Sequence, residues 1–305
     1  MKSNLVEKAL KIINDKRYDA ESYAQNNKSK AFEDETFKSI YLRYVGKMIN
    51  DARENVIDND SLERLKNHYE NRLKELGIDS VDPHYSCNKC NDTGFKDGKY
   101  CECLVEQLNK LLKQESGFLN LEDFDNANFE IFDNKDLIKK LYSVMKKWCY
   151  SDFEKNLVLL SGQTGVGKTH LMKCMANELI KQHKIVLLTT SFAMHQDFVK
   201  SYACREPEEK QNIISRYLQA EVLFIDDLGT ELRQPNITVN YLYQVLNERK
   251  MNKRPTIITS NLNLDDIMEY YDERIFSRIA DKTSSICVYI EGNDLRLKNK
   301  SQQNC

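Results

Sequence analysis

Eight consecutive residues, GQTGVGKT from Gly162 to Thr169, have the types and spacing needed to hold a nucleoside triphosphate. Glycines let the backbone curl so that successive N–H groups face the phosphates, and a helix that begins in the loop adds a favourable dipole. Lys168 is expected to reach the β- and γ-phosphates, and the Thr169 hydroxyl to bind Mg²⁺. A chance glycine loop is the alternative, but an apolar run precedes this loop and a helical pattern follows it. The sequence therefore predicts an ATP site.

Two consecutive carboxylates follow another apolar run, in EVLFIDDLG. Asp226, at the end of a buried strand, is the expected partner of Mg²⁺, and Asp227 stands where a carboxylate could polarise the attacking water. The alternative is a pair that only caps the next loop. Many ATPases of this organisation carry glutamate at the second position, so the shorter Asp227 leaves the rate of hydrolysis open.

A third apolar run, PTIITSN, ends in Ser260 and Asn261. Taken alone, Asn261 is typical of a turn. The order of phosphate loop, acidic strand end and polar strand end instead favours an amide that hydrogen-bonds the water or the γ-phosphate. The residues expected to contact the nucleotide are Gly162, Gln163, Thr164, Gly165, Val166, Gly167, Lys168, Thr169, His170 and Asp226.

Four of the nine cysteines lie within seventeen residues. They are Cys87, Cys90, Cys101 and Cys103. Tetrahedral Zn²⁺ takes four thiolates or imidazoles at this kind of separation, and Gly94 and Gly98 allow tight turns between them. Because C-x-C is less usual than C-x-x-C, His84 is an alternative ligand. Unliganded structural thiols and a redox function are further alternatives. The spacing predicts a zinc site.

These residues need a scaffold that brings strand ends together. Short apolar runs separated by helical patterns predict a parallel five-stranded sheet flanked by helices, an α/β fold. The five runs are NLVLLS, KIVLLTT, AEVLFID, PTIITSN and SICVYI.

The composition is that of a globular chain. Its 305 residues are 41% hydrophobic and 30% charged, with a net charge of −2, so any contact with nucleic acid must be local. No apolar run reaches the roughly 18–20 residues that span a bilayer, and the amino terminus lacks the apolar core of a secretory signal. We expect a cytoplasmic protein with reduced thiols and no contact with a membrane.

Three regions are expected along the chain: a helical zinc-binding domain (residues 1–117), a linker that folds against the next domain (118–133) and the sheet domain (134–305). In the first, DSLERLKNHYENRLKELG predicts a helix with Asp60 as N-cap, Glu63 as its capping-box partner and Gly77 as the stop. Its apolar stripe either packs within this domain or forms a docking or coiled-coil face.

The motifs GQTGVGKTHL, VLFIDDLG, TIITSNL and YDERIFSRI together resemble those of DnaC/DnaI-type bacterial replicative helicase loaders, which are AAA+ ATPases related to the initiator DnaA. The resemblance is strong over residues 134–297, and the cysteine-bearing region resembles the helicase-binding domain of DnaI-type loaders. Transposition helpers of the IstB kind and phage-encoded loaders share nearly all of these motifs.

The resemblance implies roles for three arginines. In DERIFSRI, Arg278 matches the arginine finger that reaches the nucleotide of a neighbouring protomer, with Arg274 as the competing candidate. Arg296, in GNDLRLK, matches the sensor-2 arginine. Without the resemblance, each would be an ordinary surface residue.

The resemblance also implies partners. The stretch between the second and third strands matches a helical insertion that faces single-stranded DNA, and Phe198, Lys200 and Tyr202 offer aromatic and cationic contacts there. Aromatics at four-residue spacing are otherwise core residues. The expected function is loading of a DnaB-type replicative helicase onto single-stranded DNA, with slow, assembly- or DNA-dependent ATP hydrolysis and self-association into an AAA+ assembly. The alternatives are a transposase helper, another DNA-targeting ATPase, or an adaptor that binds ATP with little hydrolysis.

Overall fold

The computed structural model describes residues 4–54 and 58–296, apart from the side chain of Pro235. The chain divides into two compact units, with the dividing points inside α1 and α4. The helical unit comprises residues 10–104, and the sheet unit comprises residues 1–9 and 105–305. The predicted domain limits at 117 and 133 concern pieces that fold independently, and they stay a prediction.

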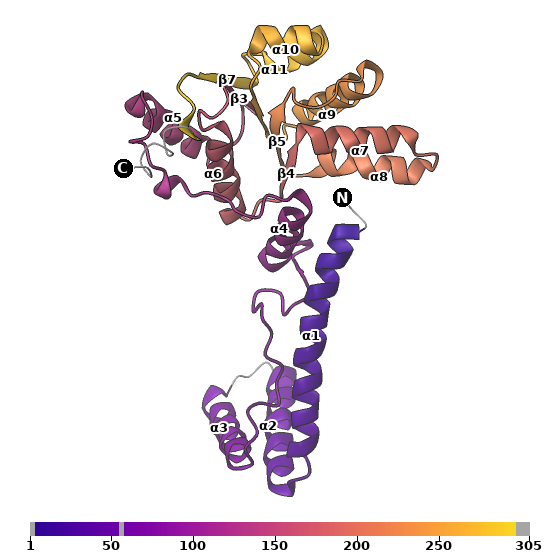
Figure 1. The fold of residues 1–305 in the computed structure, drawn as a ribbon. Coiled ribbons are helices and arrows are strands. Elements are labelled where there is room, and N and C mark those ends of the chain that lie inside the picture. The colour runs from indigo at the N-terminus through magenta and orange to yellow at the C-terminus, as the bar shows by residue number, and fades with distance from the viewer. Residues whose placement is uncertain (1–3, 55–57, 297–305) are drawn as a thin grey trace. The chain divides into compact units, whose positions relative to one another are not determined.

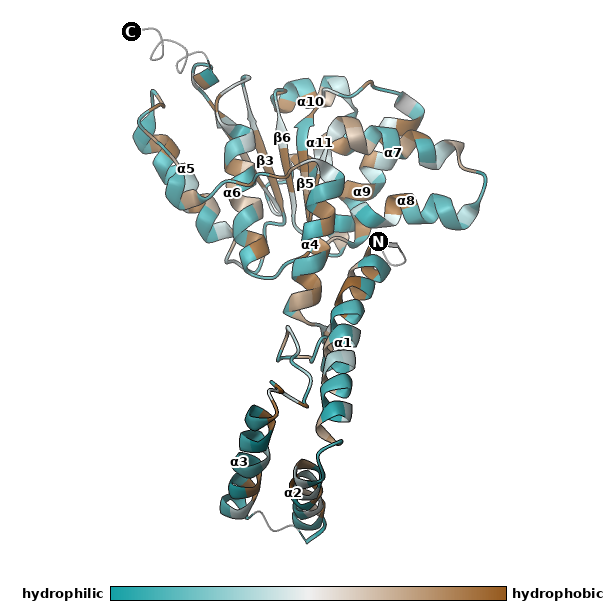
Figure 2. Ribbon diagram, turned by 60° about the horizontal axis from the view of Figure 1, so that its bottom comes forward, coloured by the Kyte–Doolittle hydropathy of each residue, from teal (hydrophilic) through white to brown (hydrophobic). Residues whose placement is uncertain are grey.

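The sheet unit is built on five parallel strands in the order β4-β5-β6-β3-β7. They are β3 (Leu157–Gly162), β4 (Val186–Thr190), β5 (Val222–Leu228), β6 (Thr256–Ser260) and β7 (Ser285–Ile290). All five predicted runs form these strands, so the predicted fold class is confirmed. The central strands β3 and β6 are buried along their whole length, as expected for a parallel sheet covered on both faces (Figure 2).

Helices cover both faces of this sheet, with α5 and α6 on one side and α7, α8 and α9 on the other (Figure 1). The helices of the unit are α4 (Glu102–Ser116, from Val105 on), α5 (Lys135–Trp148), α6 (Lys168–Lys181), α7 (Ser191–Ala203), α8 (Pro207–Gln219), α9 (Asn240–Met251), α10 (Leu264–Tyr270) and α11 (Glu273–Ile279), with a 3₁₀ turn at Phe124–Asn126 and a π-helical turn at Pro235–Val239. Because the strands are parallel, their carboxyl ends meet at one edge, where ligands bind in such sheets.

The segment 118–133 is attached to the core of the sheet unit. Phe124 is buried there, and Phe118, Phe129 and Phe132 pack against the same cluster. The last turns of α4 are also tied to the sheet, since the Asn109 side chain donates to Lys184 O (2.8 Å) and accepts from Val186 N (3.0 Å).

The helical unit holds most of α1 (Asn4–Ala31), α2 (Glu35–Glu54), α3 (Asn59–Glu75) and the hairpin β1 (Phe95–Lys96) and β2 (Lys99–Tyr100). Its buried cluster is small: Ala31, Phe37, Tyr69, Leu73 and Val81. The predicted helix is present, but its N-cap is Asp58, which accepts from Ser61 N, and not Asp60. The helix begins at Asn59, before the predicted cap, because the Asp58 side chain caps it. Asp58 was not predicted because it precedes the apolar pattern. Gly77 follows the helix with φ +70°, as expected for a stop.

Within the described residues, no helix is both long and apolar enough to cross a membrane.

Candidate nucleotide site and candidate metal centre

The phosphate-binding loop, Gly162–Thr169, connects β3 to α6 at the carboxyl edge of the sheet. Gly162 has φ +145°, and a Cβ there would lie 2.2 Å from Ile290 O on the neighbouring strand. Gly165 has φ +82°, and a Cβ there would overlap the Asp294 carboxylate. Both positions therefore require glycine, which explains the spacing of the motif in structural terms.

Lys168 lies buried at the centre of the site. Its Nζ donates to Gly162 O and Gln163 O (2.7 Å each) and to Asn261 Oδ1 (2.9 Å). Burial lowers the pKa of Lys168. The geometry brings the loop lysine together with the amide at the end of β6, two groups that the sequence placed in one site.

Asp226, at the end of β5, points to the first turn of α6. Its Oδ1 accepts from Thr169 Oγ1 (3.0 Å) and from Thr259 Oγ1 (2.5 Å). Burial raises the pKa of Asp226. A carboxylate and a hydroxyl are hard oxygen donors of the kind that Mg²⁺ prefers, so this pair fits the ion expected beside ATP phosphates.

Thr259 was not found from the sequence. It lies on β6, which separates β5 from β3, so a side chain on β6 can reach the ends of both neighbours. Besides contacting Asp226, its Oγ1 accepts from Asp227 N (2.9 Å). The one available signal was the run of hydroxyl residues at the end of PTIITSN.

Asp227 has a left-handed backbone, with φ +56°, which is uncommon outside glycine. Four hydrogen bonds hold this conformation, one of them from Thr230 N to the Asp227 carbonyl (3.2 Å). Besides the bond from its amide to Thr259, its carbonyl accepts from Ser191 Oγ (2.7 Å) and Thr230 Oγ1 (2.8 Å). The conformation directs Asp227 to the wall of the nucleotide cavity, away from Asp226 in its buried pair.

The nucleotide cavity has a volume of about 270 Å³. Its lining residues are Thr164, Gly165, Gly167, Lys168, Thr169, His170, Asp227, Asn261, Leu295 and Arg296. Of the predicted contacts, Gly162, Gln163, Val166 and Asp226 are not in the lining. Val166 packs into the core, and Asp226 lies behind Thr169.

Arg296 enters the cavity through the segment that follows β7. Leu295 N donates to Gly165 O (3.1 Å), which lays this segment on the phosphate-binding loop. Asp294 Oδ1 accepts from Arg296 N (2.9 Å) and turns the chain toward the cavity. The same path places Leu295 in the lining of the cavity, although Leu295 was not predicted from the sequence.

Arg274 and Arg278 lie on α11 and do not line the nucleotide cavity of their own chain. Both guanidinium groups lie 5.4 Å from the centre of the Tyr243 ring. Arg278 also donates to Asn247 Oδ1 (2.8 Å) and to the Tyr243 hydroxyl (3.2 Å), whereas Arg274 forms an ion pair with Asp272 (2.8 Å). Arg278 is thus held by neutral groups, and Arg274 is partly neutralised.

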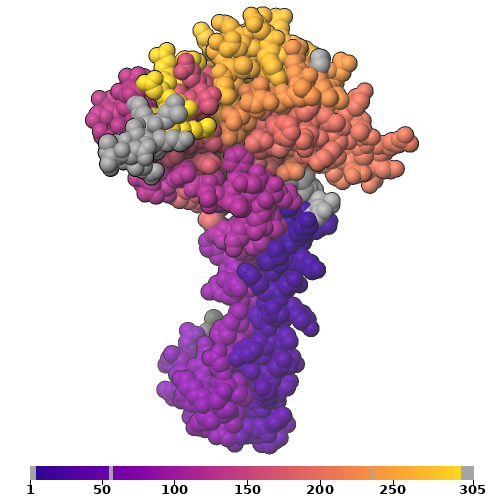
Figure 3. All heavy atoms as spheres, viewed as in Figure 1, coloured from indigo at the N-terminus to yellow at the C-terminus, as the bar shows by residue number. Residues whose placement is uncertain are grey.

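The insertion between β4 and β5 forms the α7–α8 pair, which projects from the sheet unit (Figures 1 and 3). Phe198 is only 2% exposed and stacks on Tyr241 with ring centres 5.3 Å apart, so its expected contact with DNA is wrong. Its side of the helix packs onto α8 and α9. Lys200 and Tyr202 are exposed, and so is Phe192 at the start of the same helix.

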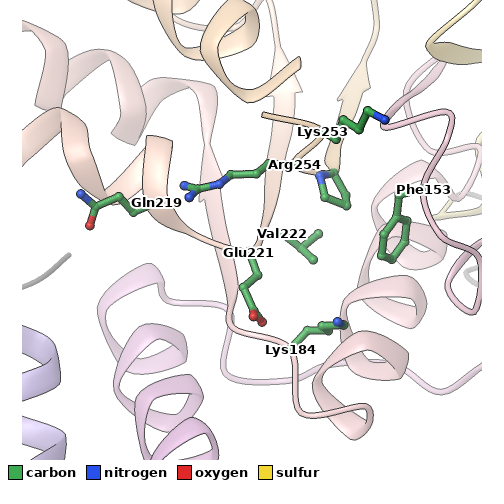
Figure 4. Close-up of a pocket in the computed structure, with 8 residues that line it drawn as sticks. Phe153, Lys184, Gln219, Glu221, Val222, Lys253 and Arg254 are labelled. Carbon is green, nitrogen blue, oxygen red and sulfur yellow. The ribbon is translucent and has the colours of Figure 1, made fainter. Parts of the chain in front are cut away.

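A second cavity, of about 210 Å³, lies at the opposite edge of the sheet, where β4, β5 and β6 begin (Figure 4). Its cationic groups do not converge: Arg254 extends toward Gln219, away from Phe153, and donates to Leu218 O. Glu221 accepts from Ile185 N (2.7 Å). These side chains are engaged with the backbone around the strand starts, which indicates a structural role.

The four predicted cysteines of the helical unit come together. Their Sγ atoms all lie within 4.8 Å of one another, and Cys90 and Cys101 are buried. Two turns produce this cluster. The Asp92 carboxylate accepts from Ser86 N (2.7 Å) and Cys87 N (2.9 Å), and the β1–β2 hairpin returns the chain to Cys101.

The donor set fits a tetrahedral soft-metal site. Burial opposes ionisation of the Cys90 thiol, but the Gly94 amide and the neighbouring thiols outweigh it and lower the pKa of Cys90 to about 7, whereas burial raises the pKa of Cys101 and Cys103. Thiolates are the ligands that bind zinc, and four of them satisfy its coordination without a further residue. His84 is not in the cluster. It lines a different cavity, with Tyr69 and Leu73, so it is not an alternative ligand in this arrangement.

Comparison with known proteins finds a matching family over most of the sheet unit. The family of IstB-like ATP binding proteins matches residues 106–303. The uncharacterized protein YqaM of Bacillus subtilis (strain 168) is 31% identical over 229 residues, which cover 70% of this chain and 71% of YqaM. The replicative helicase loader DnaC of Buchnera aphidicola subsp. Schizaphis graminum is 24% identical over 224 residues, 70% of this chain and 89% of DnaC. Among solved structures, the crystal structure of DnaI gives a TM-score of 0.44 at 20% identity, covering 57% of this chain and 90% of that one.

Proposed function

Because this chain belongs to the family of IstB-like ATP binding proteins and is related to DnaC, we propose that it is an ATP-dependent helicase loader. In this role it delivers a ring-shaped replicative helicase onto single-stranded DNA when replication starts or restarts. The sheet unit binds and slowly hydrolyses ATP, and the zinc-bearing helical unit grips the helicase.

The proposed chemistry uses the groups around the nucleotide cavity. Asp227 orients the attacking water and accepts its proton as the bond from the γ-phosphorus to the bridging oxygen breaks. Lys168 neutralises charge on the phosphates, and Asn261, which contacts Lys168, also faces the γ-phosphate. Thr169 and Asp226 would hold Mg²⁺, which neutralises further phosphate charge when bound.

Two arginines complete the proposed site. Arg296, from the same chain, takes the sensor-2 position. Arg278 acts on the nucleotide of a neighbouring protomer, which agrees with its absence from the lining of its own cavity. Arg278 is preferred to Arg274 because its partners are neutral, so its charge is available to a phosphate.

One contact carries the proposal that DNA controls hydrolysis. Ser191 is the first residue of α7, the helix proposed to face single-stranded DNA, and its hydroxyl donates to the carbonyl of Asp227 (2.7 Å). Any shift of α7 on binding DNA therefore reaches the backbone of the residue proposed to activate water. Lys200, Tyr202 and Phe192 provide the exposed cation and rings for DNA contact.

A transposase helper is the second candidate, because IstB-like proteins define the matched family. Affinity capture with purified partners separates the two functions. A loader retains the replicative helicase of its host, whereas a helper retains a transposase and no helicase. ATP turnover with and without single-stranded DNA tests the third possibility, an adaptor. Equal and negligible turnover in both conditions would favour that adaptor.

Mixing variants tests the arginine finger. Arg278→Ala should leave ATP binding intact and abolish assembly-dependent hydrolysis. Mixed with Lys168→Ala, it should partly recover, because some contacts then join an intact site to an intact finger. Normal hydrolysis by Arg278→Ala alone under assembling conditions would assign the finger to Arg274 or to no residue here.

A further inference from the structure

Glu231, in the turn that follows β5, is a buried carboxylate with only 4% of its surface exposed. Its Oε2 accepts from Gly229 N (3.0 Å), and its Oε1 accepts from the Tyr271 hydroxyl. Its backbone carbonyl accepts from the Tyr270 hydroxyl (2.8 Å). A buried carboxylate is costly unless such donors satisfy it, so the arrangement ties these three residues closely to Glu231.

One side of this contact is the nucleotide site. Gly229 has φ +99°, and a Cβ there would lie 2.5 Å from Leu262 Cδ1, so the turn has little freedom. The Thr230 hydroxyl donates back to Asp227 O (2.8 Å). The turn begins at Asp227, and Glu231 therefore holds the other end of this turn in place.

The other side is the arginine-bearing helix. Tyr271, 2% exposed, joins α10 to α11, and its carbonyl accepts from Arg233 Nη2 (3.3 Å). The next residue, Asp272, caps α11 by accepting from Ile275 N (3.0 Å). Burial, and then the adjacent Glu231, raise the pKa of Tyr271, so its hydroxyl stays protonated as a donor.

We propose that Glu231 and Tyr271 are positioning residues that fix α11, with its finger arginine, on the turn that carries Asp227. Each chain then presents its own water-activating turn and the finger for its neighbour's nucleotide as one rigid piece. The inference rests on the proposed function, because it assigns the finger to α11. It adds the contact by which the state of one nucleotide site reaches the next site along the assembly.

Tyr271→Phe removes the hydroxyl and keeps the ring. We expect assembly-dependent turnover to fall by about 10- to 100-fold, as when a catalytic group is displaced by up to about 1 Å, while KM and nucleotide affinity stay within about twofold. Glu231→Gln should give a smaller loss of the same kind. The matched control is Tyr217→Phe, which removes a buried hydroxyl that donates to Asp197 Oδ2 (2.6 Å) in α7, and it should turn over ATP normally without DNA.

Mixing assigns the defect to one side of the interface. Tyr271→Phe combined with excess Lys168→Ala should regain near wild-type turnover for each Tyr271→Phe chain, because Lys168→Ala offers sound fingers. An equal mixture with Arg278→Ala should gain nothing, because both fingers are defective. The reverse pattern, or unchanged turnover by Tyr271→Phe alone, would overturn the positioning role. If Arg278→Ala itself turns over normally, the finger assignment fails and this inference fails with it.

Discussion

The nucleotide cavity and the cysteine cluster are both small sets of side chains held by tight turns, but different forces hold those turns. The phosphate-binding loop follows β3, whose residues Leu157–Leu160 are at most 3% exposed inside a large apolar core. The cysteines lie around a hairpin of two-residue strands, whose Phe95 and Tyr100 are 42% and 38% exposed.

The two sites should therefore depend on their ligands to different degrees. Burial of the central strands organises the nucleotide cavity, so we expect its shape to persist when no nucleotide is bound. The hairpin around the cysteines leaves its aromatic side chains partly exposed, so we expect metal binding to supply much of the free energy that holds the four thiols together. Substitutions in the nucleotide site should therefore reduce turnover, whereas substitutions in the cysteine cluster should reduce the stability of the helical unit.

The largest effect is expected at the nucleotide site. Lys168→Ala removes the buried ammonium that bridges the loop and Asn261, so ATP turnover should fall by at least about 10²-fold because a charge that stabilises the transition state is lost. Thermal unfolding should change little in comparison. Turnover is measured by phosphate release at saturating ATP, and a rate close to that of the wild type would contradict the site.

Asp227→Asn is expected to slow hydrolysis at the same site without preventing ATP from binding. The amide keeps the shape of the side chain but accepts protons poorly, so turnover should fall by about 10²- to 10⁴-fold while ATP affinity is kept. A fluorescent ATP analogue measures the affinity. Loss of binding in this variant would overturn its role as the water activator.

The paired change Cys87→Ser and Cys90→Ser should remove about one zinc per chain. In small zinc-finger peptides the apparent binding free energy of the metal is on the order of 10 kcal/mol, so the helical unit should lose its cooperative unfolding. The sheet unit should still bind the ATP analogue. Elemental analysis of protein purified without chelators provides the measurement, and wild-type protein without zinc would remove the metal from the account.

The smallest effect concerns the helical unit away from the metal. The Asp34 carboxylate accepts from Arg72 Nη2 (2.6 Å) and Arg72 Nε (3.0 Å), and these bonds, with one from Phe37 N, lower the pKa of Asp34 to about 2. A lowered pKa stabilises the folded state at pH values above the ordinary aspartate range, and this stabilisation is lost as the pH falls toward 2. Asp34→Asn should therefore lower the melting temperature at pH 7 by a few degrees or less.

The comparison of Asp34→Asn with the wild type is made at the same pH, so that loss of metal affects both proteins alike. The difference in melting temperature should shrink between about pH 4 and pH 2. A difference that does not depend on pH would show that the ion pair is not its source.

The sequence predicted much of the fold and part of the site. Strand positions and the phosphate-binding loop were predictable because apolar runs and the spacing of glycines can each be recognised within one short segment. Thr259 was missed because its role depends on β6 lying between β3 and β5, which no single segment encodes. Phe198 was misassigned because a helical aromatic pattern does not reveal which face Tyr241 covers. The Glu231–Tyr271 contact joins residues 40 positions apart and leaves no local pattern at either end.

The proposal that the zinc-bearing helical unit grips a replicative helicase is tested by capture of that helicase. Wild-type protein and the variant with Cys87→Ser and Cys90→Ser are each immobilised with ATP and offered purified helicase, after both have been shown to bind the ATP analogue equally. The account predicts that the wild type retains the helicase and the variant does not. Equal capture by both proteins would contradict a zinc-dependent grip on the helicase. Absence of capture by the wild type would contradict the proposal that this protein is a helicase loader.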